Sequence, residues 1–208
     1  MLEILLASLV SGFVEYPAAP WRMAGQLWLS LFRVPHDVDA VRPRGMYGVA
    51  LVRYLEPSPL TYDELLVARV PQGEKAVTIT DIWVDSPASM AGGRELWAIP
   101  KQLCDFDLLL RQRLMGDTAR WSTDVDGRPL ASATFRDLSR MSVRLPFKGA
   151  TLQTRETGER VAAELTGSAR VSPCQGSWTF AADGPLGWLA GRRPLLSFRQ
   201  RDFRMTFG

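Results

Sequence analysis

The side chains that could take a direct part in a reaction are few in this sequence. Only three lysines are present, Lys75, Lys101 and Lys148, and every other basic residue is an arginine. The single histidine, His36, is not accompanied by a Gly-x-Ser-x-Gly elbow, which disfavours a serine hydrolase triad. Any chemistry that uses a primary amine therefore has three candidate residues, and Lys75 and Lys148 fall in expected turns or loops where a lysine is solvated.

Other reaction classes lack their sequence signatures. There is no His-Glu-x-x-His motif and no cluster of cysteine and histidine, so we expect no metal site. There is no glycine-rich phosphate loop or dinucleotide fingerprint either, so we expect no cofactor.

Lys101 is expected at the junction between a helix and a strand. Residues 85–103 interrupt a pattern of strands and have helical features, including Asp85 or Ser86 as an N-cap and a proline that ends the helix before Lys101. Gly92-Gly93 weaken such a helix by about 1 kcal/mol each, which indicates that another group packs closely there. Rigid neighbours of this kind can aim Lys101 into a cavity.

Short strand-like runs dominate the rest of the chain. Turn signals separate them, with PQGE at Pro71–Glu74 and Asp126-Gly127 as predicted hairpin turns. The pattern predicts an antiparallel sheet that closes into a barrel or a sandwich. The clearest runs are Gly25–Val34, Met46–Tyr54, Glu64–Val70, Lys75–Val84 and Phe106–Leu114.

Length and composition indicate one ordinary globular domain over residues 1–208. The chain is 46% hydrophobic and 23% charged, and its net charge of +3 is spread along the sequence, which disfavours a nucleic-acid partner. Cys104 and Cys174 are expected as free thiols in a reducing cytoplasm. Residues 1–15 predict a packing helix; they lack a basic segment and are too short to cross a membrane, so we expect neither secretion nor a membrane partner.

The segment around Lys101 resembles the signature of the acetoacetate decarboxylase superfamily. Gly93-Arg94-Glu95, a short gap and Pro100-Lys101 match that signature at its spacing, and Tyr62-Asp63-Glu64 matches the Tyr-x-Glu that precedes it. The resemblance is strongest over residues 46–107.

The resemblance implies a mainly β (α+β) fold, an antiparallel, cone-shaped closed β-barrel with a few flanking helices and an internal cavity. It also implies a homo-oligomer. In the decarboxylases the first lysine of a Pro-Lys-Lys run forms a Schiff base with a ketone, and by position that lysine is Lys101. An amine with a pKa of about 10.4 must first lose its proton, which burial or a neighbouring cation favours. Glu64 is then implied as the group that handles a proton.

This sequence departs from the family pattern at three places. Gln102 replaces the second lysine, Gln26 stands where an arginine is expected, and Val49 or Ala50 occupies the place of an acidic residue. These changes weaken acetoacetate decarboxylation as the reaction. Apart from Lys101 and Glu64, five residues are candidates for contact with substrate: Gln26, Trp83, Arg94, Trp97 and Gln102.

The arginine and the tryptophans among these candidates also have structural interpretations. Arg94 with Glu95 more commonly forms an ion pair or a contact at a helix end, and tryptophans such as Trp28, Trp83 and Trp97 are more commonly core. Arg199 and Arg201 would share one face of a strand, most simply a solvated one.

The function that the sequence favours is a lyase acting on a small-molecule keto acid or related carbonyl compound through a Lys101 Schiff base, of the decarboxylase or the aldolase-dehydratase type. Two alternatives remain open. One is a non-covalent biosynthetic cyclase or isomerase on the same barrel, and the other is a non-catalytic ligand-binding barrel.

Overall fold

The described chain is built almost entirely from strands. A computed structural model describes residues 14–112, 116–139 and 141–208, and the packing helix predicted for residues 1–15 falls almost wholly outside them. The elements are β1 (Trp21–Val34), β2 (Gly45–Leu55), β3 (Tyr62–Arg69), β4 (Thr78–Val84), α2 (Pro87–Trp97), β5 (Gln102–Leu103), β6 (Asp105–Arg111), β7 (Thr118–Val125), β8 (Arg128–Asp137), β9 (Val143–Thr154), β10 (Arg160–Phe180), the 3₁₀ turn η1 (Gly187–Leu189) and β11 (Leu196–Phe207).

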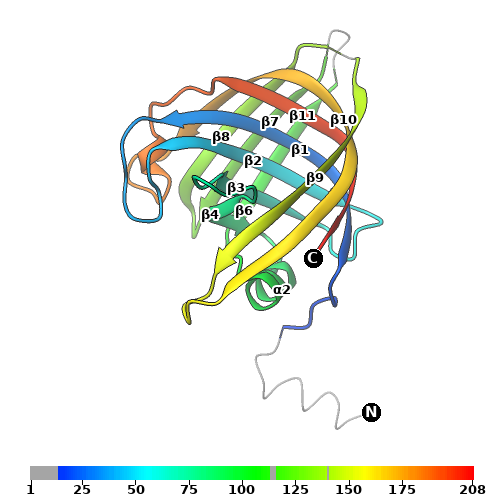
Figure 1. Cartoon of the computed structure of the whole chain (residues 1–208). Helices are drawn as coiled ribbons and strands as arrows, with labels where there is room; N and C mark the ends of the chain where they lie inside the picture. The colour runs from blue at the N-terminus through cyan, green and yellow to red at the C-terminus, as the bar shows by residue number, and fades with distance from the viewer. Residues whose placement is uncertain (1–13, 113–115, 140) are drawn as a thin grey trace.

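The strands form one strongly curved, 11-stranded sheet (Figure 1). Its order is β5-β4-β3-β2-β1-β11-β10-β8-β7-β6, and β9 pairs with β10 off this path. β10 is 21 residues long, and along its length it pairs with β9, β11 and β8. The pairs β3–β4 and β7–β8 are antiparallel hairpins, as the turn signals predict, and both Asp126 and Gly127 have the positive φ that a tight hairpin turn uses.

The ladder of strands does not close into a complete barrel. Val77, the residue before β4, forms one parallel bridge with Thr151 of β9, and no continuous ladder joins the two strands. The buried side chain of Gln153 extends this seam, because its amide accepts from the Ile79 backbone N–H at 3.2 Å and donates to the Ile79 carbonyl at 3.0 Å. The predicted mainly β, antiparallel fold is therefore present, whereas the predicted closed barrel is not confirmed.

Both faces of the central strands are buried, each against its own apolar cluster. Along β3, alternate side chains point to opposite faces, so Leu65 and Val67 pack in the cluster that also contains residues of β7 and β8, while Tyr62 packs in the other. Because both faces are covered, the strands of this region read as continuous apolar runs instead of alternating ones.

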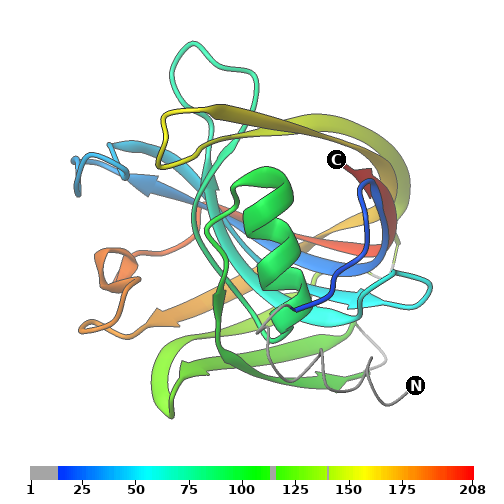
Figure 2. The same cartoon turned by 90° about the horizontal axis from the view of Figure 1, so that it is seen from below.

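Helix α2 lies across one end of the curved sheet, as Figure 2 shows from below. The predicted cap is present: the Ser86 hydroxyl accepts from the Ser89 backbone N–H at 3.1 Å, and Pro87 opens the first turn. The helix ends at Trp97, and Ala98 follows in the left-handed region with φ 53°. None of the described helices combines the length and apolar character that a crossing of the bilayer requires.

Candidate active site

A cavity of about 350 Å³ lies within the curve of the sheet beside α2. Its wall is mostly apolar, and side chains from seven strands and from α2 contribute to it. The apolar lining comprises Trp21, Met23, Leu27, Val52, Leu66, Ala68, Val77, Ile79, Ile82, Trp97, Ile99, Phe147, Leu165, Phe203, Met205 and Phe207. Its size and apolar character are typical of a small-molecule site.

The amine of Lys101 reaches this cavity and is surrounded by oxygen atoms. Its Nζ donates to Glu64 Oε2 at 2.9 Å, to Ser89 Oγ at 2.9 Å and to the Tyr62 hydroxyl at 3.3 Å. The Tyr54 hydroxyl donates to the second carboxylate oxygen of Glu64 at 3.1 Å. Lys101 is 4% exposed and Glu64 3%, so the pair is shielded from water.

The local fold explains why these five side chains meet. Tyr62 and Glu64 are two residues apart on β3 and so share a face, and Tyr54 lies directly opposite Tyr62 in the register of β2 and β3. Ser89 lies in the first turn of α2, and Lys101 follows that helix. Two strands, one helix and the segment after the helix therefore each fix one part of the group.

Two electrostatic effects shift the pKa of Lys101 in opposite directions. Burial lowers the pKa of Lys101, but the Glu64 carboxylate and the Tyr62 hydroxyl outweigh it, so that the pKa is raised above its ordinary value of 10.5. Burial also raises the pKa of Tyr62, and it raises that of Tyr54 further with the help of the Glu64 charge. Both phenols are therefore neutral at physiological pH, and the resting Lys101 is an ammonium paired with Glu64.

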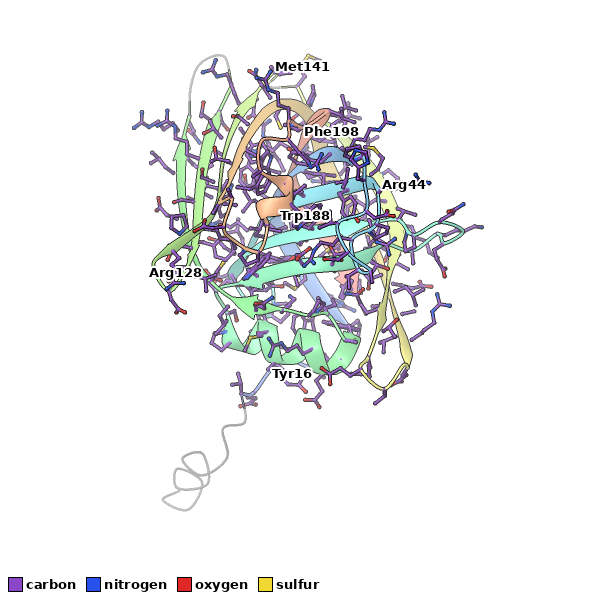
Figure 3. All side chains as sticks on the ribbon, turned by 90° about the vertical axis from the view of Figure 1, so that its left-hand side faces the viewer. Tyr16, Arg44, Arg128, Met141, Trp188 and Phe198 are labelled. Carbon is purple, nitrogen blue, oxygen red and sulfur yellow. The ribbon has the colours of Figure 1, made fainter. Side chains whose placement is uncertain are left out.

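Two features of α2 hold Lys101 in place. A Cβ atom at Gly93 would lie 2.8 Å from Lys101 Cδ and 2.9 Å from Cε, so the lysine stem crosses the helix where glycine leaves room. The Arg94 Nε donates to the Lys101 backbone carbonyl at 2.7 Å. The close packing predicted at Gly92-Gly93 is thus present, and Gly92 faces Trp21 and Tyr16, the residue labelled beside α2 in Figure 3.

Gly93→Ala is expected to displace the Lys101 amine while leaving the fold intact. The added methyl group displaces the flexible Lys101 stem, which has a cost. Alanine favours a helix over glycine by about 1 kcal/mol, and because this gain offsets the cost, the free energy of unfolding changes little. We expect trapping of the Lys101 amine by an added aldehyde and cyanoborohydride to slow by about tenfold to a hundredfold, because the amine moves away from Glu64. Peptide mapping after trapping measures the rate.

Gly92→Ala is the matched control. Its methyl group would meet the Trp21 ring at 2.7 Å and does not approach Lys101, so this variant should lose stability and keep the trapping rate in the folded protein. Equal trapping rates in the two variants would contradict a positioning role for Gly93.

The structure places the five predicted contact residues at different distances from this cavity. Trp97 lines it. Arg94 is exposed and acts on the Lys101 carbonyl, and Gln102 is exposed on β5; neither lines the cavity. Gln26 accepts from Arg199 and Trp83 packs in the cluster on the opposite face of the sheet, so these two lie outside the cavity as well.

The structure also tests the exposure that the sequence predicts for other basic residues. Lys75 and Lys148 are exposed as expected, although Lys148 lies on β9 and not in the predicted loop. Arg199, in contrast, is not solvated: it is 4% exposed and donates to Asp137 at 2.7 Å and to Asp117 at 3.1 Å. Sequence reasoning did not select Tyr54 and Ser89 as site residues, and it named Tyr62 only as part of a motif. The spacing of Tyr62 from Glu64 on one strand was the available signal; Tyr54 and Ser89 required the strand register and the placement of the helix.

Comparisons with known proteins agree with the fold. The model of the family "Acetoacetate decarboxylase (ADC)" matches residues 34–155, more than half of the chain. No curated protein matches the sequence. The fold is similar to an acetoacetate decarboxylase-like enzyme from Sphingomonas wittichii RW1, with a TM-score of 0.65 and 14% identity over 96% of this chain and 97% of that one.

Two other solved structures have the same fold. The acetoacetate decarboxylase of Legionella pneumophila has a TM-score of 0.60 and 15% identity over 98% of this chain and 92% of its own. The enduracididine biosynthesis enzyme MppR, complexed with the condensation product of pyruvate and imidazole 4-carboxaldehyde, has a TM-score of 0.59 and 16% identity over 95% and 90%. From the family match, which spans the helix, the lysine and Glu64, the chain belongs to the acetoacetate decarboxylase family.

Proposed function

We propose that this protein is an enzyme that acts on a carbonyl compound through an imine on Lys101, with Glu64 as the proton carrier. The observation that supports this most directly is a buried lysine amine that faces an apolar cavity and lies 2.9 Å from a buried carboxylate. A nucleophilic amine with an adjacent base, shielded from water, is the arrangement that imine formation requires.

Imine formation needs no proton donor or acceptor beyond the side chains of Lys101 and Glu64. The Lys101 ammonium passes one proton to the Glu64 carboxylate, and the free amine adds to the carbonyl carbon, so that a C–N bond forms and the C=O π electrons move to oxygen. A proton moves from nitrogen to that oxygen to give a carbinolamine. Glu64 then protonates the hydroxyl group, water leaves, and the nitrogen lone pair forms the iminium ion. Glu64 ends as a carboxylate beside the cation.

The neighbours have defined parts in this scheme. Tyr54 donates to Glu64 and stays neutral, which holds the carboxylate in one orientation toward the amine. Ser89 and Tyr62 accept hydrogen bonds from the resting ammonium, and the Tyr62 hydroxyl, which lines the cavity, can donate to the substrate oxygen while the amine adds to the carbonyl carbon. From the iminium ion, loss of an α proton or, in a β-keto acid, of carbon dioxide gives an enamine, the common intermediate of aldol, dehydration and decarboxylation reactions, so we propose a lyase-type activity.

The ligands of one relative favour a carbonyl substrate. MppR has been solved with pyruvate and with a condensation product of pyruvate and an aldehyde, and it shares this fold at 16% identity. Pyruvate is a carbonyl compound and the second ligand is formed from two of them, which agrees with carbonyl chemistry at Lys101, although pyruvate also carries a carboxylate.

Reductive trapping tests the proposal. The protein is incubated with a panel of aldehydes, ketones and keto acids and then with sodium cyanoborohydride, and the adduct is mapped by mass spectrometry. We expect an adduct on Lys101 in excess of that on Lys75 and Lys148, the two exposed lysines, which serve as internal controls for non-specific labelling. Lys101→Met should remove it. Labelling of the three lysines at equal rates would overturn the proposal.

A non-covalent enzyme is the second candidate, and one observation favours it. The raised pKa of Lys101 keeps the amine protonated at rest, as a cation that can polarise a carbonyl oxygen without forming a bond. A cyclase or isomerase of this kind would turn over its substrate with no trappable adduct, and a ligand-binding protein would show binding without turnover.

A further inference from the structure

The cavity around Lys101 carries no net charge. Among the residues that the structure describes, Lys101 and Glu64 are the only ionised side chains in its lining, and they neutralise each other at 2.9 Å. The remaining polar groups are uncharged: Tyr54, Tyr62, Thr151 and Gln200. The other lining residues are aliphatic, aromatic or thioether side chains.

A substrate carboxylate would therefore have no cation of its own in this site. In the iminium state the positive charge remains on the Lys101 nitrogen and the negative charge on Glu64, so the pair stays balanced. A keto acid would add a second anion beside Glu64 between apolar walls, and an unpaired buried charge is strongly disfavoured. The described arginines do not relieve this, because none of them lines the cavity. Arg199, which precedes Gln200 on β11, belongs to the opposite face, where it is bound by Asp137 and Asp117.

The uncharged polar groups suit a neutral ligand instead. The Thr151 hydroxyl is buried in the wall of the cavity, with its residue 4% exposed, and it has no hydrogen-bond partner within the described chain. An orphaned hydroxyl costs free energy that a ligand oxygen can recover. A hydroxyl or carbonyl group of the substrate can bond Thr151, whereas one hydroxyl cannot neutralise a carboxylate.

We infer that this site takes a neutral, largely apolar aldehyde or ketone, with one further uncharged oxygen at most near Thr151, and excludes keto acids. This inference rests on the proposed imine chemistry at Lys101. It also selects among the reactions: a substrate without a carboxylate cannot lose carbon dioxide, so the enamine formed from it serves aldol or retro-aldol bond changes, dehydration or isomerisation.

A matched set of three probes tests the inference on the full chain. The neutral member is 4-phenylbutan-2-one; 2-oxo-4-phenylbutanoate replaces its methyl group by a carboxylate, and 3-oxo-5-phenylpentanoate adds a carboxylate to that methyl group. Each is incubated with the protein and cyanoborohydride at one concentration. The labelling rate of Lys101 is divided by the rate for Nα-acetyl-lysine, which removes differences in intrinsic carbonyl reactivity.

We expect the neutral ketone to label Lys101 faster than either acid after this correction, by on the order of a hundredfold. Labelling of Lys101 by the acids at an equal or greater corrected rate would overturn the inference and leave the imine proposal standing. If no probe labels Lys101, the imine proposal fails, and displacement of the neutral dye Nile red then tests the inference separately. Displacement by the ketone and not by the acids would support it, and equal displacement by all three would overturn it.

A cation placed in the wall should reverse the preference. Gln200 is half-buried in the cavity lining, and Gln200→Arg supplies the missing positive charge, with Gln200→Met as the control for side-chain length. The arginine variant should raise the relative labelling by the two acids at least about tenfold, while the methionine variant keeps the preference for the ketone. Equal preferences in the two folded variants would count against the charge argument.

Discussion

Glu64→Gln is expected to destabilise the protein by about 3–5 kcal/mol at neutral pH, because it leaves the Lys101 ammonium buried without a counter-charge. The amide of the substituted side chain would still offer an oxygen to the Tyr54 hydroxyl, so the loss of stability measures the effect of removing the charge alone. Lys101→Met should cost a similar amount, since it leaves the Glu64 carboxylate unpaired. The double variant should recover most of the stability, because no buried charge remains. Chemical denaturation of the four proteins closes the cycle.

The same variants have distinct pH dependences. In the wild type the pKa of Lys101 is raised, so the stability from this pair is fully present below the ordinary value of 10.5 and is lost as the pH rises through the higher folded value. In Glu64→Gln the charge that most strongly opposes burial is gone and only Tyr62 still opposes it, so the pKa of Lys101 falls and stability is lost as the pH falls through that lower value. Additive losses in the double variant, or parallel pH profiles, would contradict a coupled pair.

Asp137→Asn is expected to have the second large effect, also about 3–5 kcal/mol. The Asp137 carboxylate is almost fully buried and accepts hydrogen bonds from both Arg199 and Arg201. Arg199 is held further by Asp117 and by Gln26, and its guanidinium lies 5.0 Å from the centroid of the Trp28 ring. Removing the Asp137 charge leaves two arginines with one remaining carboxylate at the edge of the group. Denaturant unfolding measures the loss.

Asp202→Asn is the control for this substitution. Asp202 pairs with Arg144, but both side chains are exposed, so the loss should stay below about 1 kcal/mol. Because Asp137 and its two arginines lie on the face opposite the cavity, Lys101 in the folded Asp137→Asn variant should still be labelled at the wild-type rate. A loss of labelling without a loss of stability would contradict the structural role assigned to this group.

Much of the local structure was predictable because it depends on neighbouring residues. The cap at Ser86, the helix that follows Pro87, the tight turn at Asp126-Gly127 and the need for space at Gly92-Gly93 all follow from backbone preferences over a few positions. Lys101 and Glu64 could be selected from a family signature, and the structure brings them together.

The face on which each side chain lies was less accessible to sequence reasoning. Trp83 and Ile82 are consecutive and both buried, yet only Ile82 lines the cavity. In a sheet covered on both faces, alternation does not separate core from surface, so the pattern cannot show which apolar residues meet the ligand. The prediction that Arg199 is solvated is wrong for a related reason. An arginine in a strand pattern is most simply assigned to the solvent face, and the acidic residues that bind Arg199 lie far away in sequence, on β8 and just before β7.

The seam between β4 and β9 has a consequence for how the cavity could be reshaped. Elsewhere the wall is a continuous ladder, but here it depends on one bridge and on the side chains of Thr78 and Gln153. Three residues of the seam line the cavity: Val77, Ile79 and Thr151. Because so few main-chain hydrogen bonds join the two sides here, we expect a larger ligand to be admitted along this line more easily than through the long strand pairs, and without moving Lys101. New ligand ranges, whether selected in nature or in the laboratory, should therefore arise from substitutions along this seam, while the end of the cavity that carries Lys101 stays fixed.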